Sequence, residues 1–282
     1  MHKSYPEKYI KKQLNQFRRN YIRSVSLKNK EAIHDFRVAL KRIVAIIKFL
    51  KKHNLKRNIN KVYKSSNLES FYRAGGRLRE IQINKKILKT YRTKFDNRFS
   101  TLNNYLTGRE KIAIRELKKS RKRISFKKTR KFESILLKNF REIQEDKILE
   151  LVDQFISARI TEIETLIIDR HVESKLHLIR KLIKSIKYLL EMSGQKERSY
   201  GKLNFTIERI TLLEDWIGHW HDLYVFREAV KDLGRWLEQR VKKDAETDFL
   251  LLHIERDYQI IFNETVQYIY TDFKIENNKI EV

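Results

Sequence analysis

One proline and seven glycines are spread over the 282 residues of this chain. These two residue types end helices and form tight turns, so long uninterrupted segments remain between them. Within these segments apolar residues recur at steps of three and four, which is the period of an amphipathic helix. The sequence therefore predicts an all-α protein built from long helices.

We expect helices over about 5–24, 29–53, 55–74, 77–106, 110–118, 132–140 and 147–169. Asn29 is expected to cap the second of these helices. Gly75 and Gly76 are expected to end the third, and Gly108 to lie at the end of the fourth, because glycine adopts left-handed backbone without steric cost. The tract 118–131 contains nine basic residues in fourteen and is expected to hold a turn.

The expected helix 29–53 has two distinct faces. One face predicts a buried core and consists of Ile33, Phe36, Leu40, Ile43, Ile46, Ile47 and Leu50. The other is a cationic stripe of His34, Arg37, Lys41, Lys48 and Lys52. The acid in this stretch, Asp35, points away from the stripe. A face with cations alone is unusual for an amphipathic helix and indicates an anionic ligand.

The composition points to the same kind of ligand. Lys and Arg number 63 against 36 Asp and Glu, which gives a net charge of +27 and implies a polyanionic partner. Nucleic acid, an anionic membrane surface and inorganic polyphosphate all qualify. The absence of cysteine excludes disulfides, cysteine-ligated zinc and thiol catalysis. With no signal peptide and no long apolar run in the sequence, a cytoplasmic protein without membrane association is expected.

The second half of the chain repeats features of the first. His177, Arg180 and Lys184 have the spacing of the first stripe and lie 143 residues further along. The segment that begins at Gly218 likewise follows the one at Gly76 after 142 residues. The sequence thus predicts two copies of one helical unit, 1–143 and 144–282.

These segments resemble the CHAD family, named for conserved histidines in an α-helical domain. The resemblance rests on the spacing His-x-x-Arg-x-x-x-(Lys/Arg)-(Lys/Arg), followed by Gly-x-x-Arg-(Asp/Glu), once in each half. It implies two antiparallel helical bundles related by a pseudo-twofold axis, which together form one CHAD domain. It also implies that basic helices line a central cavity and bind inorganic polyphosphate.

With Lys48 from the stripe, the expected polyphosphate-binding residues are His34, Arg37, Lys41, Arg42, Lys48, Arg79, His177, Arg180, Lys181, Lys184, Lys187, Tyr188 and His221. The chain departs from the family pattern at three places. Val44 stands where a further arginine is usual, Glu80 and Gln82 replace two aspartates, and His221 replaces the arginine of the second glycine segment.

The leading hypothesis is therefore a noncatalytic polyphosphate receptor, a monomer or dimer, possessing no cofactor and associated with polyphosphate granules. Phosphate or sulfate is expected to occupy the site in crystals. Nucleic-acid binding is the alternative, and the role of the tract 118–131 stays open. Catalysis would need a carboxylate cluster or an activated nucleophile, and the Glu-x-Glu-x-Lys signature of the CYTH triphosphatases often fused to CHAD domains is absent. No metal site is expected, because His219 and His221 diverge by about 200° on a helix.

Overall fold

The computed structural model describes residues 4–23, 30–53, 55, 58–96, 98–167, 172–194, 197–200, 203–239 and 244–272. Within these ranges the elements are α1 (Tyr5–Arg23), α2 (Lys30–Lys52), α3 (Ile59–Ser65), α4 (Leu68–Lys94), α5 (Ser100–Lys122), α6 (Phe126–Arg141), α7 (Glu145–Ile167), α8 (Val172–Ser193), β1 (Glu197–Tyr200), β2 (Leu203–Thr206), α9 (Ile207–Glu238) and α10 (Ala245–Asp272). The predicted all-α class is confirmed. In the described residues the structure also contains an antiparallel hairpin of β1 and β2 between α8 and α9, which the sequence did not predict.

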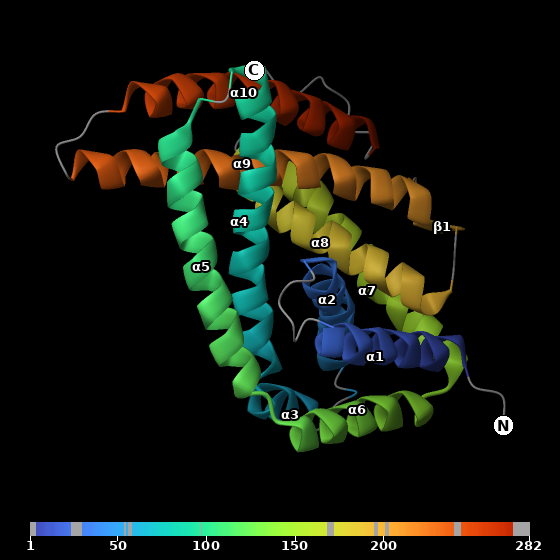
Figure 1. Cartoon of the computed structure of the whole chain (residues 1–282). Coiled ribbons are helices and arrows are strands. Elements are labelled where there is room, and N and C mark those ends of the chain that lie inside the picture. Colours follow the sequence, from blue (N-terminus) through green and yellow to red (C-terminus); the bar gives the residue numbers. More distant parts are fainter. Residues whose placement is uncertain are drawn as a thin grey trace.

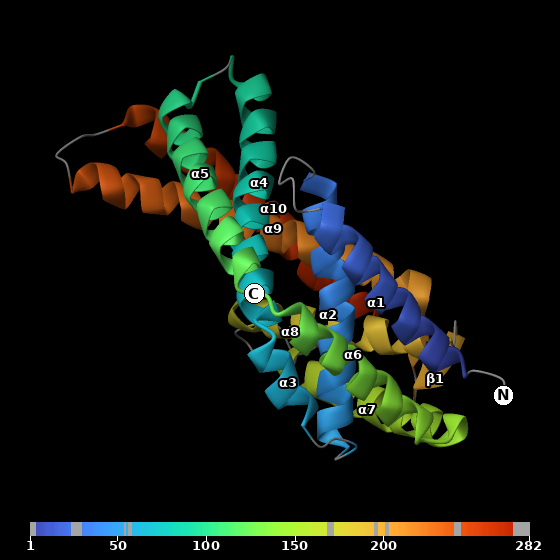
Figure 2. The same cartoon turned by 60° about the horizontal axis from the view of Figure 1, so that its bottom comes forward.

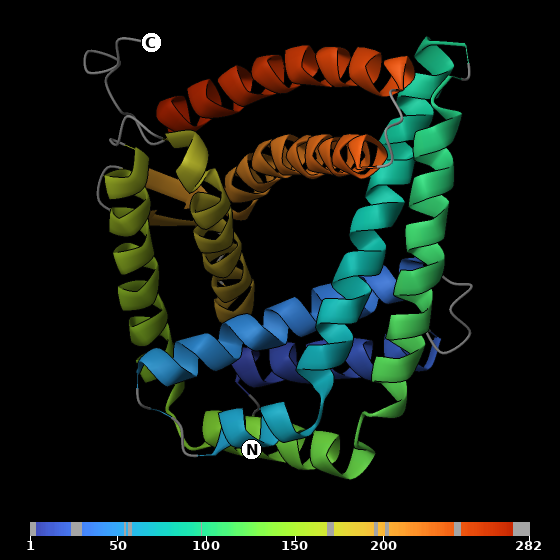
Figure 3. The same ribbon diagram turned by 90° about the vertical axis from the view of Figure 1, so that its left-hand side faces the viewer.

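The long helices pack as consecutive pairs, α1 with α2, α4 with α5, α7 with α8 and α9 with α10 (Figure 1). The short α3 packs on α6, which runs beside α1 (Figure 2). Four inner helices, one from each long pair, surround the centre of the molecule (Figure 3). Helix α2 packs on α4 and α8, and α9 packs on the same two helices. The order of the pairs is the same in both halves, whereas the pseudo-twofold relation stays a prediction.

The predicted core face of α2 is confirmed, because all seven of its apolar residues are buried. Phe36 lies at its centre, with its ring 5.0 Å from that of Phe17 on α1 and 4.7 Å from that of Phe71 on α4. Burial of this face fixes the rotation of α2 about its own axis. Arg37 and Lys41 of the cationic stripe are thereby turned toward the other inner helices, whereas Lys48 and Lys52 are exposed.

The helix ends expected at glycines are wrong. Gly75 and Gly76 lie inside α4, and Gly108 lies inside α5. The chain turns instead at residues such as Asn67 and Phe99, whose φ values are 62° and 71°. Asparagine tolerates this left-handed backbone, so Asn67 divides the segment that we expected to form one helix over 55–74. The expected cap Asn29 lies outside the described residues.

The turn expected in the basic tract 118–131 is confirmed. Helix α5 ends at Lys122, and α6 begins at Phe126. Ser125 caps α6, its Oγ accepting a hydrogen bond from the backbone N of Lys128. The tract therefore belongs to two helices joined at the corner where α5 meets α6.

Gly108→Ala is expected to raise the free energy of unfolding by about 1 kcal/mol, because alanine is the better helix former. A Cβ at Gly108 would meet no neighbouring heavy atom within 4 Å. Gly75→Ala is the matched variant, since its Cβ would lie 3.2 Å from Cδ of Arg37 and should offset the gain. Urea unfolding measures both, and an equal gain at the two positions would contradict the packing of Arg37 on Gly75.

Candidate anion-binding site

Helix α2 packs on α8 (Figure 3), and each of these helices carries one of the two cationic stripes. Arg37 and Lys41 come from α2, and Arg180, Lys184 and Lys187 come from α8. We call these five side chains the central cationic cluster. Their charges act on one another across the two helices, since Lys184 and Arg180 both influence Lys41. The fold therefore brings together residues that lie about 140 positions apart in the sequence.

Lys41 is the most strongly affected member of the cluster. Burial lowers its pKa, and the charges of Lys184, Arg37 and Arg180 lower it further, to about 7. Glu214 of α9 acts in the opposite direction but does not restore the ordinary lysine value. The cluster thus holds more positive charge than its own acids neutralise, which makes it receptive to an anion.

Glu214 neutralises one side of the central cationic cluster. Its Oε2 accepts a hydrogen bond from Nζ of Lys187 at 2.7 Å, and its Oε1 lies 3.2 Å from Nζ of Lys184. Burial acts to raise the pKa of this carboxyl, yet the two lysines hold it below its usual value. The ionised carboxylate therefore ties α8 to α9.

Arg37 is held against the backbone of α4. Its Nη1 donates a hydrogen bond to the carbonyl oxygen of Gly75 at 3.2 Å, and its Cζ lies 5.3 Å from the ring centre of Tyr72. The glycine pair permits this approach, because a Cβ at Gly76 would lie 3.3 Å from Nη2 of Arg37. The glycines that we expected to end a helix therefore position a cation.

The two arginines of the cluster retain donors without acceptors. Nε of Arg37 and Nε of Arg180 are buried, and neither has a hydrogen-bond partner in the part of the chain that the structure describes. A buried donor without an acceptor is costly, and an incoming phosphate oxygen would satisfy it.

Both stripe histidines have a lowered pKa, although His34 is exposed and His177 is partly buried. Burial lowers the pKa of His34, with a further decrease from Arg79 of α4. Burial also lowers the pKa of His177, with a further decrease from His221 of α9. The rings of His177 and His221 are 5.1 Å apart. Each stripe histidine thus lies beside the residue expected from the glycine segment of its own half, Arg79 or His221.

Arg42 and Tyr188, which we expected to bind ligand, take part in an internal network. Arg42 donates from Nε and Nη2 to the two carboxylate oxygens of Glu191, at 2.8 and 3.1 Å, and its Cζ lies 5.7 Å from the ring centre of Tyr188. Tyr9 of α1 donates to the same carboxylate at 2.7 Å. Tyr188 itself is buried, which raises its pKa. This network joins α1, α2 and α8 beside the cluster.

Lys48 and Lys181 are exposed, unlike the lysines of the central cationic cluster. The charge of Lys181 contributes to lowering the pKa of His177. A role of either lysine in ligand binding stays a prediction.

Two acids at the site were missed from the sequence. Glu214 precedes Gly218 by one helical turn, so its closeness to the expected glycine segment was a signal that could have been used. Glu191 follows Lys187 at the same spacing on α8. Neither position belongs to the cationic pattern on which the expectation rested.

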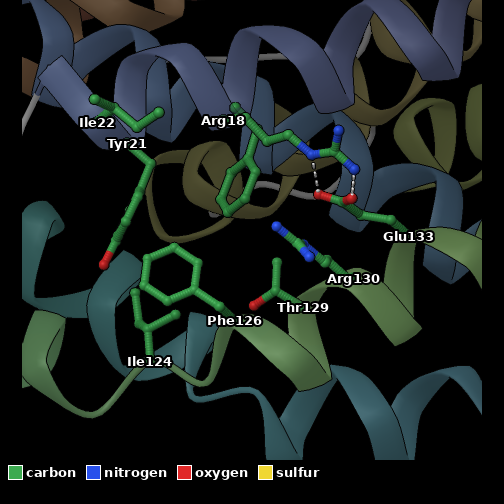
Figure 4. Close-up of a pocket in the computed structure, with 9 residues that line it drawn as sticks. Arg18, Tyr21, Ile22, Ile124, Phe126, Thr129, Arg130 and Glu133 are labelled. Carbon is green, nitrogen blue, oxygen red and sulfur yellow. Dashed lines mark hydrogen bonds and ion pairs between the residues drawn. The ribbon is translucent and has the colours of Figure 1, made fainter.

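Three hollows of the described chain lie away from the cluster. One, of about 210 Å³, lies between α1 and α6 (Figure 4). Its lining is mostly apolar, with Phe126 at its lower side and Arg130 of the basic tract beside it. Arg18 at its edge is paired with Glu133. The central cavity implied by the family resemblance stays a prediction.

The described residues include no group of three or more His, Cys, Asp or Glu side chains placed to hold a metal ion. Nor does any described helix combine the length and the apolar character needed to cross a bilayer.

The model of the CHAD domain family matches residues 8–231. The chain belongs to the CHAD family. A crystal structure of the CHAD domain from the plant Ricinus communis is similar over 97% of this chain and 91% of that one, with a TM-score of 0.65 and 14% identity. At this identity the likeness shows a CHAD fold and nothing more. No curated protein matches the chain.

Proposed function

We propose that this CHAD protein binds inorganic polyphosphate without catalysing a reaction on it, through the central cationic cluster. The observation that carries the proposal is the crowding of cations from α2 and α8, which contributes to lowering the pKa of Lys41 to about 7. A bound polyanion would relieve this repulsion and supply acceptors to Arg37 and Arg180. The family likeness supports the same ligand class.

The mixture of cations suits a phosphate chain. Arginine can donate two hydrogen bonds to neighbouring oxygens, whereas lysine acts as a mobile point charge. Arg37 and Lys41 are four residues apart on α2, which places them about 6 Å apart along the helix axis. Arg180 and Lys184 have the same spacing on α8. Each of the two helices therefore offers a row of donors to a linear anion.

Nucleic acid is the alternative polyanion. Single-stranded nucleic acids are usually held by aromatic rings on which the bases stack, in addition to cations. At the cluster Tyr188 is buried, and the ring of Tyr72 lies beneath the guanidinium of Arg37. Tyr188 is thus closed to stacking and Arg37 already occupies one face of Tyr72, so polyphosphate is the better match. Granule association in the cytoplasm would follow from this function.

Competition at one fixed salt concentration tests the proposal. Long-chain polyphosphate labelled at one end should bind, and unlabelled polyphosphate should displace it at far lower phosphate concentration than duplex DNA or RNA. Fixed salt is essential, because every such affinity falls steeply with ionic strength. Equal displacement by nucleic acid would favour the alternative, and a failure of polyphosphate to bind would refute the proposed function.

A further inference from the structure

Glu214 places a carboxylate within the group of cations that is proposed to receive phosphate. We propose that this carboxylate is an internal counter-anion, which a phosphate of the bound chain replaces. Glu214 would thereby make the site selective for chains of several phosphates over a single phosphate or sulfate ion. This inference rests on the proposed function. It assigns the discrimination between phosphate chains and single ions to Glu214.

The geometry of the carboxylate supports an exchange of this kind. Its two oxygens each contact one lysine of α8, Lys184 at 3.2 Å and Lys187 at 2.7 Å. The side chains of Glu214, Lys184 and Lys187 are only 15–17% exposed, so the pair is shielded from solvent. Two phosphate oxygens could make the same contacts with the same two lysines.

The remaining cations of the cluster are not paired with an acid, although the charges of Asp222 and Glu214 act on Arg180 and that of Glu214 acts on Lys41. Among the described residues, Arg37, Lys41 and Arg180 take part in no ion pair, in contrast to Lys184 and Lys187. The cluster therefore has one side where Glu214 forms ion pairs and one side where it acts only without direct contact.

This asymmetry affects short and long anions differently. A single phosphate must displace Glu214 unaided to gain Lys184 and Lys187, and a tethered carboxylate competes at a high effective concentration. A chain already held by Arg37, Lys41 and Arg180 presents its next phosphate at a comparably high local concentration. Glu214 thus lowers the affinity for single ions more than the affinity for chains.

Glu214→Gln tests the inference, because the amide keeps the shape of the side chain and loses its charge. We expect the affinity for orthophosphate to rise by about tenfold, the scale of a charge-assisted hydrogen bond, and that for tripolyphosphate to rise less. The affinity for long-chain polyphosphate should rise less, so the ratio between long-chain and single-ion affinity should fall. Isothermal titration calorimetry at constant ionic strength measures all three.

Glu255→Gln is the matched control. Glu255 of α10 also lies between two cations, 3.2 Å from Arg227 and 3.1 Å from Lys231, but these belong to α9 outside the cluster. The control changes the net charge equally and should leave the ratio of affinities unchanged.

Glu214→Asp keeps the charge but shortens the reach of the side chain, so it should shift the ratio of affinities in the same direction as Glu214→Gln. It replaces Glu214→Gln if that variant does not fold.

The two levels of the account fail separately. If the unmodified protein binds no polyphosphate, the proposed function is wrong. If the unmodified protein binds it and both substitutions of Glu214 leave the ratio of affinities as in Glu255→Gln, only the inference on Glu214 is wrong. A loss of affinity in Glu214→Gln with the fold intact would also overturn it, and would make the ion pair a structural support.

Discussion

Combining Arg37→Glu with Arg180→Glu is expected to weaken the binding of long-chain polyphosphate by about 100-fold or more. The change removes two donors and adds two carboxylates, which would pair with lysines of the cluster such as Lys41 and Lys184. The loss should therefore exceed the sum of two missing contacts. Fluorescence anisotropy with end-labelled polyphosphate measures it.

Lys138→Glu with Arg235→Glu is the charge-matched control. Both side chains are well exposed, at 77% and 63%, and they lie on α6 and near the end of α9. This variant should lose only the small general attraction of a less basic protein. Arg37 also packs on Gly75, so circular dichroism must show that the double variant is folded, and Arg37→Gln with Arg180→Gln provides a milder pair. Similar losses in test and control would reject the assigned site.

The affinity for polyphosphate is expected to fall by about tenfold per pH unit above pH 7. The free protein holds the pKa of Lys41 at about 7 through burial and the cations Lys184, Arg37 and Arg180, with Glu214 acting in opposition. Bound phosphate favours the charged ammonium and raises the pKa of Lys41. At a pH between the pKa values of the free and the bound protein, binding therefore takes up a proton. The affinity is fully present below pH 7 and decreases as the pH rises.

Lys41→Arg isolates this effect, since arginine stays charged over the whole range. The variant should bind with a nearly flat profile from pH 7 to pH 9, while the unmodified protein loses affinity. His34 and His177 are expected to titrate at lower pH than Lys41, because burial lowers their pKa values from the ordinary histidine value. An unchanged slope in Lys41→Arg would show that another group takes up the proton.

The local patterns of α2 could be predicted from the sequence because they depend on helix geometry alone. A period of 3.6 residues separated its apolar face from its cationic face, and the buried residues of the structure agree with that separation. The same spacing identified Arg180 and Lys184 on α8. The family resemblance also rested on these positions.

The role of the glycines could not be predicted in this way. Gly75 and Gly76 have the conformational freedom to end a helix, but in α4 they serve the approach of Arg37 from another helix. Such a purpose depends on which helices pack together. Gly108 lies in α5 with no neighbouring side chain near it, so nothing in its surroundings explains it.

Which cations are paired with an acid also depends on tertiary packing. Arg42 and its partner Glu191 are 149 positions apart, and only the crossing of α2 with α8 joins them. Glu214 reaches Lys184 and Lys187 because α9 packs on α8. The sequence identified the cations, whereas their pairing, and hence the division of the cluster, required the fold.

A crystal structure with tripolyphosphate tests the central claim most directly. We expect density for the phosphate chain between α2 and α8, with phosphate oxygens within hydrogen-bond distance of Arg37 and Arg180. Glu214 should then have moved away from Lys184. Density for tripolyphosphate at other basic surfaces, such as the tract 118–131, with none between α2 and α8, would contradict the account.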